Sequence, residues 1–267
     1  MQELKDKVTQ ALKEQTLDGL LCLKSSGGYI LPCIVTSDNI ADLDSMVIGD
    51  ERYPIATILS AIVAKQPGKT IGVVVRGCEE KAIIELIKSN QVDANRIVQY
   101  GVACSKERAQ LCSCEVPYPS EILAGTKVEG VSDNQLLSKI EAMPSKDRLS
   151  FWMDQLGKCI KCYGCRNICP VCFCEDCAME HDDLVPTGLV PPSIPSFHLI
   201  KAIHMAGKCI DCGFCEQVCP MNIPIRTIYR KMGLVMKEVF DYEPGLSIDE
   251  RSPLGELEKG LEAVAEK

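Results

Sequence analysis

The stretch Cys159-Ile-Lys-Cys162-Tyr-Gly-Cys165-Arg-Asn-Ile-Cys169-Pro170 spaces four cysteines as C-x2-C-x2-C-x3-C and ends on a proline. The same spacing returns in Cys209-Ile-Asp-Cys212-Gly-Phe-Cys215-Glu-Gln-Val-Cys219-Pro220. The short gaps allow three thiolates of one loop to surround one metal centre, and the proline turns the chain after the fourth. A spacing this specific, repeated without error, predicts that both runs are metal ligands.

Both runs match the ligand motif of bacterial-type two-cluster ferredoxins, in which the fourth cysteine of each run binds the other cluster. The sequence therefore predicts two 4Fe–4S clusters with crossed ligands. Cluster 1 takes Cys159, Cys162, Cys165 and Cys219. Cluster 2 takes Cys209, Cys212, Cys215 and Cys169.

Structural zinc and disulfides are the alternative explanations for so many cysteines. Zinc sites use pairs of Cys, or of Cys and His, and do not need a third cysteine at the next two-residue gap. Disulfides need an oxidising compartment. Residues 1–15 are charged and lack the apolar core of a signal peptide, and no apolar run reaches the ~20 residues that a membrane-spanning helix requires. We therefore expect a cytoplasmic protein without membrane insertion.

Composition and charge restrict the partners. The chain has 267 residues, of which 46% are hydrophobic and 25% charged, so it can bury one large core or two ordinary ones. Its formal net charge is −8. A nucleic-acid partner needs a basic footprint, so we expect none.

Alternating strand and helix patterns occupy residues 1–130. Helical spacing predicts an amphipathic helix over residues 1–16, and a hairpin follows around Gly27-Gly28. The strand, helix and strand expected over 71–75, 79–88 and 96–102 indicate a parallel pair with a crossover helix, hence an α/β domain. The turn Gly77-Cys78 follows the first of these strands and opens the helix. We predict it as a cofactor-binding site, because open α/β sheets bind ligands at this position and helix N-termini favour anions.

A ferredoxin-like domain of the α+β class is expected over residues 131–240, with an insert at 171–206 that carries four prolines. Residues 103–131 look irregular, and Ser132 and Gln135 form a capping-box pattern for a helix that runs to about residue 142. Further helices are expected over 146–156, 197–206 and 225–240. Residues 241–267 are charged and turn-rich, and we expect a docking or partly disordered tail there.

Nine of the 17 cysteines lie outside the two runs. Cys172, Cys174 and Cys177 fall within six residues, which is enough for three ligands of a third iron–sulfur centre. The fourth ligand could come from Cys78, Cys104, Cys112 or Cys114. The alternative is a set of ordinary thiols, since isolated cysteines often serve as small hydrophobes. Cys22 and Cys33 are expected in the core, and His181, His198 and His204 are assigned no role.

The stretch 159–174, together with 209–215, resembles the beta subunits of coenzyme F420-dependent hydrogenases and formate dehydrogenases. Val75-Arg-Gly-Cys78-Glu-Glu and Gly101-Val-Ala-Cys104 resemble the same family. The resemblance covers roughly residues 15–230. It implies a subunit that moves electrons between a catalytic partner and an acceptor, often with a bound FAD. The glycine- and threonine-rich segment associated with flavin in these subunits is missing from this sequence.

Two functions are consistent with these observations. The first is an iron–sulfur subunit, not catalytic on its own, which relays single electrons between other redox subunits of a hydrogenase, formate dehydrogenase or heterodisulfide-reductase-like complex. The second is a flavin-containing subunit that converts hydride from a deazaflavin or nicotinamide into single electrons. Bound FAD would distinguish the two. A scaffold whose clusters only hold the fold is a third interpretation.

Overall fold

The computed structural model describes residues 1–132 and 134–255. The chain divides into two compact units, Met1–Ser132 and Asp133–Lys267.

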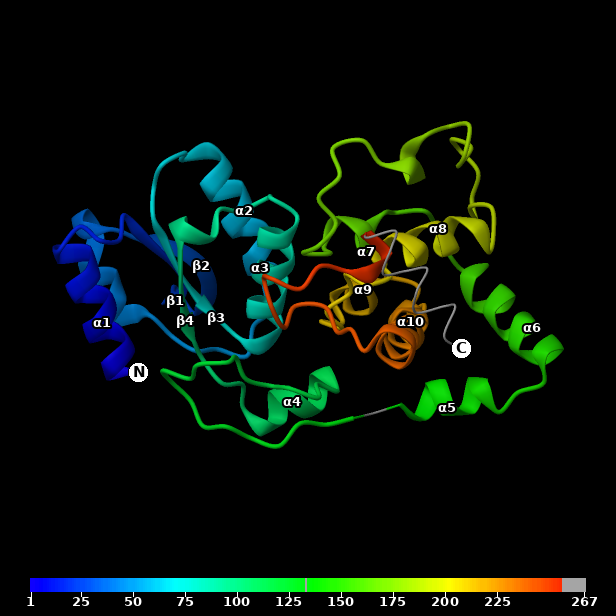
Figure 1. The fold of residues 1–267 in the computed structure, drawn as a ribbon, viewed down its shortest axis with the longest axis horizontal. Helices are drawn as coiled ribbons and strands as arrows, with labels where there is room; N and C mark the ends of the chain where they lie inside the picture. The colour runs from blue at the N-terminus through cyan, green and yellow to red at the C-terminus, as the bar shows by residue number, and fades with distance from the viewer. Residues whose placement is uncertain (133, 256–267) are drawn as a thin grey trace. The chain divides into compact units, whose positions relative to one another are not determined.

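A four-stranded sheet forms the centre of the first unit, in the order β2-β1-β3-β4 (Figure 1). The strands are β1 (Gly19–Ser26), β2 (Tyr29–Val35), β3 (Ile71–Val75) and β4 (Ile97–Gly101). β1 and β2 form the predicted antiparallel hairpin, and Gly27 and Gly28 make its turn with φ of 57° and 83°. β3 pairs in parallel with β1 and with β4, so the predicted crossover unit is confirmed.

Helices cover both sides of this sheet, with α1 on one side and α2 and α3 on the other (Figure 1). Their bounds are α1 (Gln2–Lys13), α2 (Ile55–Lys65) and α3 (Gly77–Lys88). α1 buries Leu4, Val8 and Leu12, which recur every fourth residue and pack with Leu20 and Val35 of the hairpin. Two short 3-10 helices, η1 (Ser37–Ser45) and η2 (Ala94–Arg96), complete the connections.

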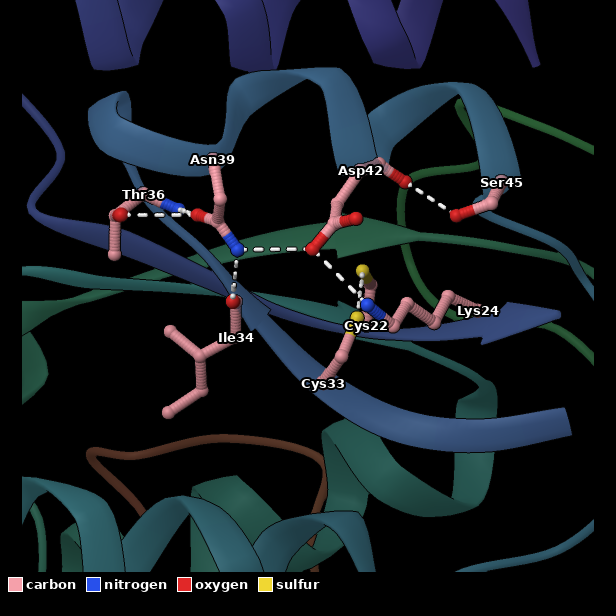
Figure 2. A network of polar contacts seen from close by, with 8 residues as sticks. All are labelled: Cys22, Lys24, Cys33, Ile34, Thr36, Asn39, Asp42 and Ser45. Atoms are coloured by element: carbon pink, nitrogen blue, oxygen red, sulfur yellow. Dashed lines mark hydrogen bonds and ion pairs between the residues drawn. The ribbon is translucent and has the colours of Figure 1, made fainter. Parts of the chain in front are cut away.

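A polar network ties the hairpin to η1 (Figure 2). Asn39 donates to the Ile34 carbonyl at 3.2 Å and to Asp42 at 2.9 Å, and Lys24 donates to Asp42 at 3.0 Å. Beneath this network, the Sγ atoms of Cys22 and Cys33 lie 3.5 Å apart on directly opposed residues of β1 and β2. Cys22 is buried and Cys33 half-buried, so both belong to the core region as expected.

Residues 103–131 contain a helix that the sequence did not predict, α4 (Lys106–Cys112), at whose start Arg108 N donates to Ser105 Oγ at 3.0 Å. The chain after α4 then packs along the carboxyl end of the sheet. Leu123 N donates to Gly101 O at 2.8 Å, and Cys104 N donates to Pro117 O at 2.8 Å. This approach is close enough that a Cβ on Gly101 would overlap the Glu121 carbonyl.

The second unit consists of helices and loops. Its elements are α5 (Gln135–Glu141), α6 (Ser145–Leu156), α7 (Gly164–Asn167), η3 (Ala178–Glu180), α8 (Ser196–Met205), α9 (Phe214–Gln217), α10 (Ile225–Phe240) and η4 (Pro253–Gly255). α6, α8 and α10 match the predicted helices. The capping role predicted for Ser132 is wrong, because α5 begins at Gln135 and its N-cap position is Asn134. The Ser132 hydroxyl donates to Glu115.

Residues 134–255 contain no β-strand, although an α+β domain was expected. The cysteine loops account for this difference. Lys161, Tyr163, Asp211 and Gly213 all have φ between 53° and 76°, and these left-handed residues interrupt any extended pairing. The loops are held instead by a core that includes Leu156, and several cysteines pack against this core.

The predicted tail, residues 241–267, lies only partly within the described residues, since 256–267 fall outside them. Its first residues pack on the unit. Asp241 closes α10 in the left-handed conformation, and Tyr242 is 1% exposed. In the part of the chain that the structure describes, no helix combines the length and apolar character needed to cross a membrane.

We expect Gly101→Ala to destabilise the carboxyl edge of the sheet by about 1–3 kcal/mol, because the new methyl group has no room beside the Glu121 carbonyl. Hydrogen–deuterium exchange of peptides from β3 and β4 should become faster. Val98→Ala is the matched control on the same strand, since Val98 is 39% exposed and its truncation should cost less than about 0.5 kcal/mol. Equal exchange in the two variants would contradict the close approach.

Candidate metal centre

One cavity of the second unit is lined by all four cysteines predicted for cluster 1. Cys159, Cys162 and Cys165 come from the first run and Cys219 from the end of the second, and the lining also includes Phe197 and His198 of α8. The structure therefore brings the fourth cysteine of the second run to the first three of the other run.

The same local geometry builds both cysteine loops. In the first, Lys161 and Tyr163 take left-handed conformations, and the short helix α7 that follows carries Cys165. In the second, Asp211 and Gly213 do the same, and α9 carries Cys215. Backbone N–H groups then turn toward sulfur: Lys161 N donates to Cys159 Sγ at 3.4 Å. Such hydrogen bonds stabilise a thiolate, which is the form that binds metal.

The cysteines predicted for cluster 2 lie deeper in the unit. Cys215 is 8% exposed, whereas Cys162 of cluster 1 is exposed. Burial raises the pKa of Cys209 to about 12 and that of Cys215 still further, and each of the two also feels the charge of Cys212. Cys169, from the first run, interacts electrostatically with Cys212 of the second. Cys172 and Cys212 are thus both neighbours of Cys169, and the crossed ligand pattern predicts the second of these contacts.

These surroundings fit an iron–sulfur cluster better than free thiols. Several buried sulfur atoms gathered in a small volume would repel one another as bare thiolates, and a metal removes that cost by coordinating and deprotonating them. His198 gives a second sign. It is 2% exposed and lines the cluster 1 cavity, and its Nδ1 has no hydrogen-bond partner among the residues that the structure describes. A buried polar atom needs a partner, and a sulfur atom of a bound cluster would supply one.

Cys172, Cys174 and Cys177, predicted as a third centre, have different surroundings. Cys172 accepts a hydrogen bond from Lys201 Nζ at 3.5 Å, Cys174 is exposed, and Cys177 is buried with Met179 and Phe197 in a separate apolar cluster. No three His, Cys, Asp or Glu side chains in residues 1–132 and 134–255 converge as ligands of a single ion. This finding concerns single ions and not clusters. A single zinc ion holds all its thiolates about 2.3 Å from one point, whereas a four-iron cluster binds each thiolate at a different iron atom. The third centre stays a prediction.

The turn predicted to bind a cofactor, Gly77-Cys78, opens α3 as expected. The backbone of Val116 and Tyr118 covers this helix end, because a Cβ on Gly77 would overlap the Tyr118 carbonyl. The buried carboxylate of Glu79 accepts the Arg76 N–H at 2.7 Å at the same place. As they are arranged, these residues do not fit the phosphates of FAD, so we derive no chemistry from a flavin there. The role of Gly77 and Cys78 stays a prediction.

Three further cysteines of the first unit, Cys104, Cys112 and Cys114, follow β4. Burial raises the pKa of Cys104 to about 11, and Cys114 and Cys112 also raise it. These three therefore lie within electrostatic range of one another, in the loop that the sequence marked as irregular.

Sequence reasoning missed two side chains of α8, His198 and Lys201, which are 2% and 1% exposed. A signal was present. Phe197, Ala202 and Met205 form the buried face of α8, and His198 and Lys201 fall on that face at helical spacing. Polar residues on an otherwise apolar helix face indicate a polar group inside the domain.

Comparison with known proteins supports iron–sulfur binding in this part of the chain. The 4Fe-4S binding domain family, Fer4, matches residues 202–225. The chain is 50% identical over 102 residues to the F420-dependent formate dehydrogenase 1 subunit beta of Methanococcus maripaludis, which is 38% of this chain and 26% of that protein. It is 39% identical over 119 residues to the F420-dependent formate dehydrogenase subunit beta of Methanocaldococcus jannaschii, which is 45% of this chain and 30% of that protein.

The matched segments thus span less than a third of the length of these curated relatives. Within that extent, the identities and the Fer4 match confirm the resemblance on which the sequence prediction rested. Over these segments the chain is similar to the beta subunits of F420-dependent formate dehydrogenases, and its residues 202–225 match a 4Fe–4S binding domain.

Proposed function

We propose that this chain is an iron–sulfur electron-transfer subunit of a multi-subunit oxidoreductase, and that it relays single electrons through two 4Fe–4S clusters held by residues 131–240. The observation that carries the proposal is the shared cavity of Cys159, Cys162, Cys165 and Cys219. Two runs separated in sequence contribute to one site with the crossed pairing that two-cluster ferredoxins use.

A bound 4Fe–4S cluster accepts and releases one electron. The chain's own residues would hold it and control its surroundings. The cysteine loops supply the thiolates, and the core around Leu156 and Tyr229 keeps water from the inner sulfur atoms. His198 lines the cavity proposed for cluster 1, and its buried Nδ1 would be available to a sulfur atom of the cluster. Hydrogen bonds to sulfur, burial and net charge are the means by which a protein sets a cluster's reduction potential.

The partners follow from the relatives, which are subunits by name. We infer that other redox subunits deliver and remove the electrons, and that a formate dehydrogenase or a related complex is the assembly. Residues 1–130 would then be an α/β domain that docks on such a subunit or approaches its cofactor, and residues 241–267 a charged tail. Cytoplasmic location belongs to the same proposal.

We expect Cys219→Ala to remove or convert the cluster held by Cys159, Cys162 and Cys165, although Cys219 belongs to the other run in the sequence. The reason is that its side chain lines their cavity. Electron paramagnetic resonance of the reduced, anaerobically purified chain should lose one of two signals.

Cys169→Ala is the matched control, because it removes the fourth cysteine of the first run and should affect the other signal. If Cys219→Ala instead abolished the signal that depends on Cys212, the ligands would not be crossed.

The proposed function predicts about eight iron atoms per chain and no flavin in protein purified without oxygen together with its partners. Both clusters should be reduced by the partner's substrate and reoxidised by the acceptor. Iron and acid-labile sulfide analysis, flavin fluorescence and visible absorption measure these properties.

About one FAD per chain, assigned to this subunit, would identify it instead as a converter of hydride into single electrons. Clusters that neither donor nor acceptor changes would leave only a structural role for them, and the relay would be wrong.

A further inference from the structure

Lys201 has the lowest exposed fraction of any charged residue that the structure describes, at 1%. It lies in the middle of the buried face of α8, between Phe197 and Met205. Burying an ammonium group costs several kcal/mol unless an opposite charge or hydrogen bonds compensate, so its surroundings should contain negative charge.

Cysteine sulfur atoms lie around this ammonium group. Its Nζ donates to Cys172 Sγ at 3.5 Å. Burial alone would lower the pKa of Lys201, and Cys169, Cys172 and Cys165 raise it above its usual value. Within residues 1–132 and 134–255, no Asp or Glu forms an ion pair with Lys201, unlike Arg226 and Arg230, which both pair with Asp211.

The helix face that carries Lys201 contacts a cluster 2 ligand, because the Sγ of Cys169 lies 3.8 Å from the Sδ of Met205, one turn after Lys201 on α8. The charge of Lys201 acts on Cys169, Cys209 and Cys215, three of the four ligands assigned to cluster 2. Of the cluster 1 ligands it acts on Cys165. Cys172 strengthens this bias, because it is hydrogen-bonded to Cys169 as well as to the lysine.

We propose that Lys201 sets the reduction potential of cluster 2, by holding a fixed positive charge beside its ligands in the interior of the domain. The inference rests on the proposed two-cluster function. Reduction adds one electron, and therefore one negative charge, to a cluster whose thiolates are already negative. A nearby ammonium stabilises the reduced state more than the oxidised state and raises the potential, and low water access keeps this effect strong. The lysine keeps its proton throughout, and the electron comes from an external one-electron donor.

The test is a redox titration of the full chain, purified without oxygen, followed by electron paramagnetic resonance. Cys219→Ala and Cys169→Ala first assign the two signals. In Lys201→Met, the ratio of reduced to oxidised cluster 2 at a fixed potential should fall at least tenfold, which corresponds to about 59 mV for one electron. Cluster 1 should shift less, and Lys201→Arg, which keeps the charge, should restore most of the cluster 2 potential.

Lys208→Gln is the matched control. It removes the same charge one residue before Cys209, but Lys208 is only half-buried and its ammonium lies 5.6 Å from the centre of the Phe173 ring. Water screens such a charge, so its removal should move the potential of cluster 2 much less.

Several results would overturn the inference. The inference fails if Lys201→Met lowers the cluster 2 potential no more than Lys208→Gln does, or if it shifts cluster 1 more than cluster 2. Folded Lys201→Met and Lys201→Gln proteins that retain cluster 1 but fail to load cluster 2 would assign the lysine to assembly instead. If the wild-type chain lacked two titrating signals, the two-cluster function itself would be wrong, whereas unchanged potentials beside two intact signals would refute only the role of Lys201.

Discussion

The second unit depends on one constraint: sulfur atoms that must become thiolates are gathered inside a small domain core. Cysteines of both runs pack with Leu156, Val171 and Tyr229, where ordinary domains place only hydrocarbon. Free thiols in such a place would resist ionisation, as burial raises the pKa of Cys165 and Cys209. Metal coordination would supply the energy that deprotonates and fixes them, so we expect cluster binding and folding of this unit to be coupled. A bound cluster would also explain the left-handed residues of the cysteine loops and the buried polar groups of α8.

Regular periodicity made much of the first unit predictable. The spacing of Leu4, Val8 and Leu12, the Gly27-Gly28 turn and the apolar strand at 71–75 each point to one structure, and each is found. Prediction failed where sequence signals were mixed. Prolines and cysteines in residues 103–131 obscured α4, which is short and is capped by Ser105. The α+β class expected for the second unit is not found in residues 134–255, where the backbone forms cysteine loops with left-handed residues instead of paired strands.

A ligand set can be predicted from spacing, because four cysteines at fixed gaps have few other uses. The roles of the surrounding residues cannot be predicted in this way. The roles of His198 and Lys201 depend on which residues α8 packs against in the folded unit. Helical periodicity places both on the buried side of α8. It does not say that one lines the cavity of Cys159 while the other meets Cys172. Such contacts join segments remote in sequence and are fixed only by the folded loops.

The unequal depth of the two cysteine sets has a consequence for damage by air. Cys162 reaches the surface, whereas Cys215 is nearly enclosed. Dissolved oxygen or peroxide would meet the outer sulfur first, and sulfenic acid formation follows exposure and thiolate character. The two sites would therefore lose their clusters in order, the outer one first. Loss of iron from the outer site would leave Cys219 without the metal that links the second run to the first. A chain partly oxidised by air would keep its inner cluster for longer. It would no longer transfer electrons, because the outer cluster would already be lost.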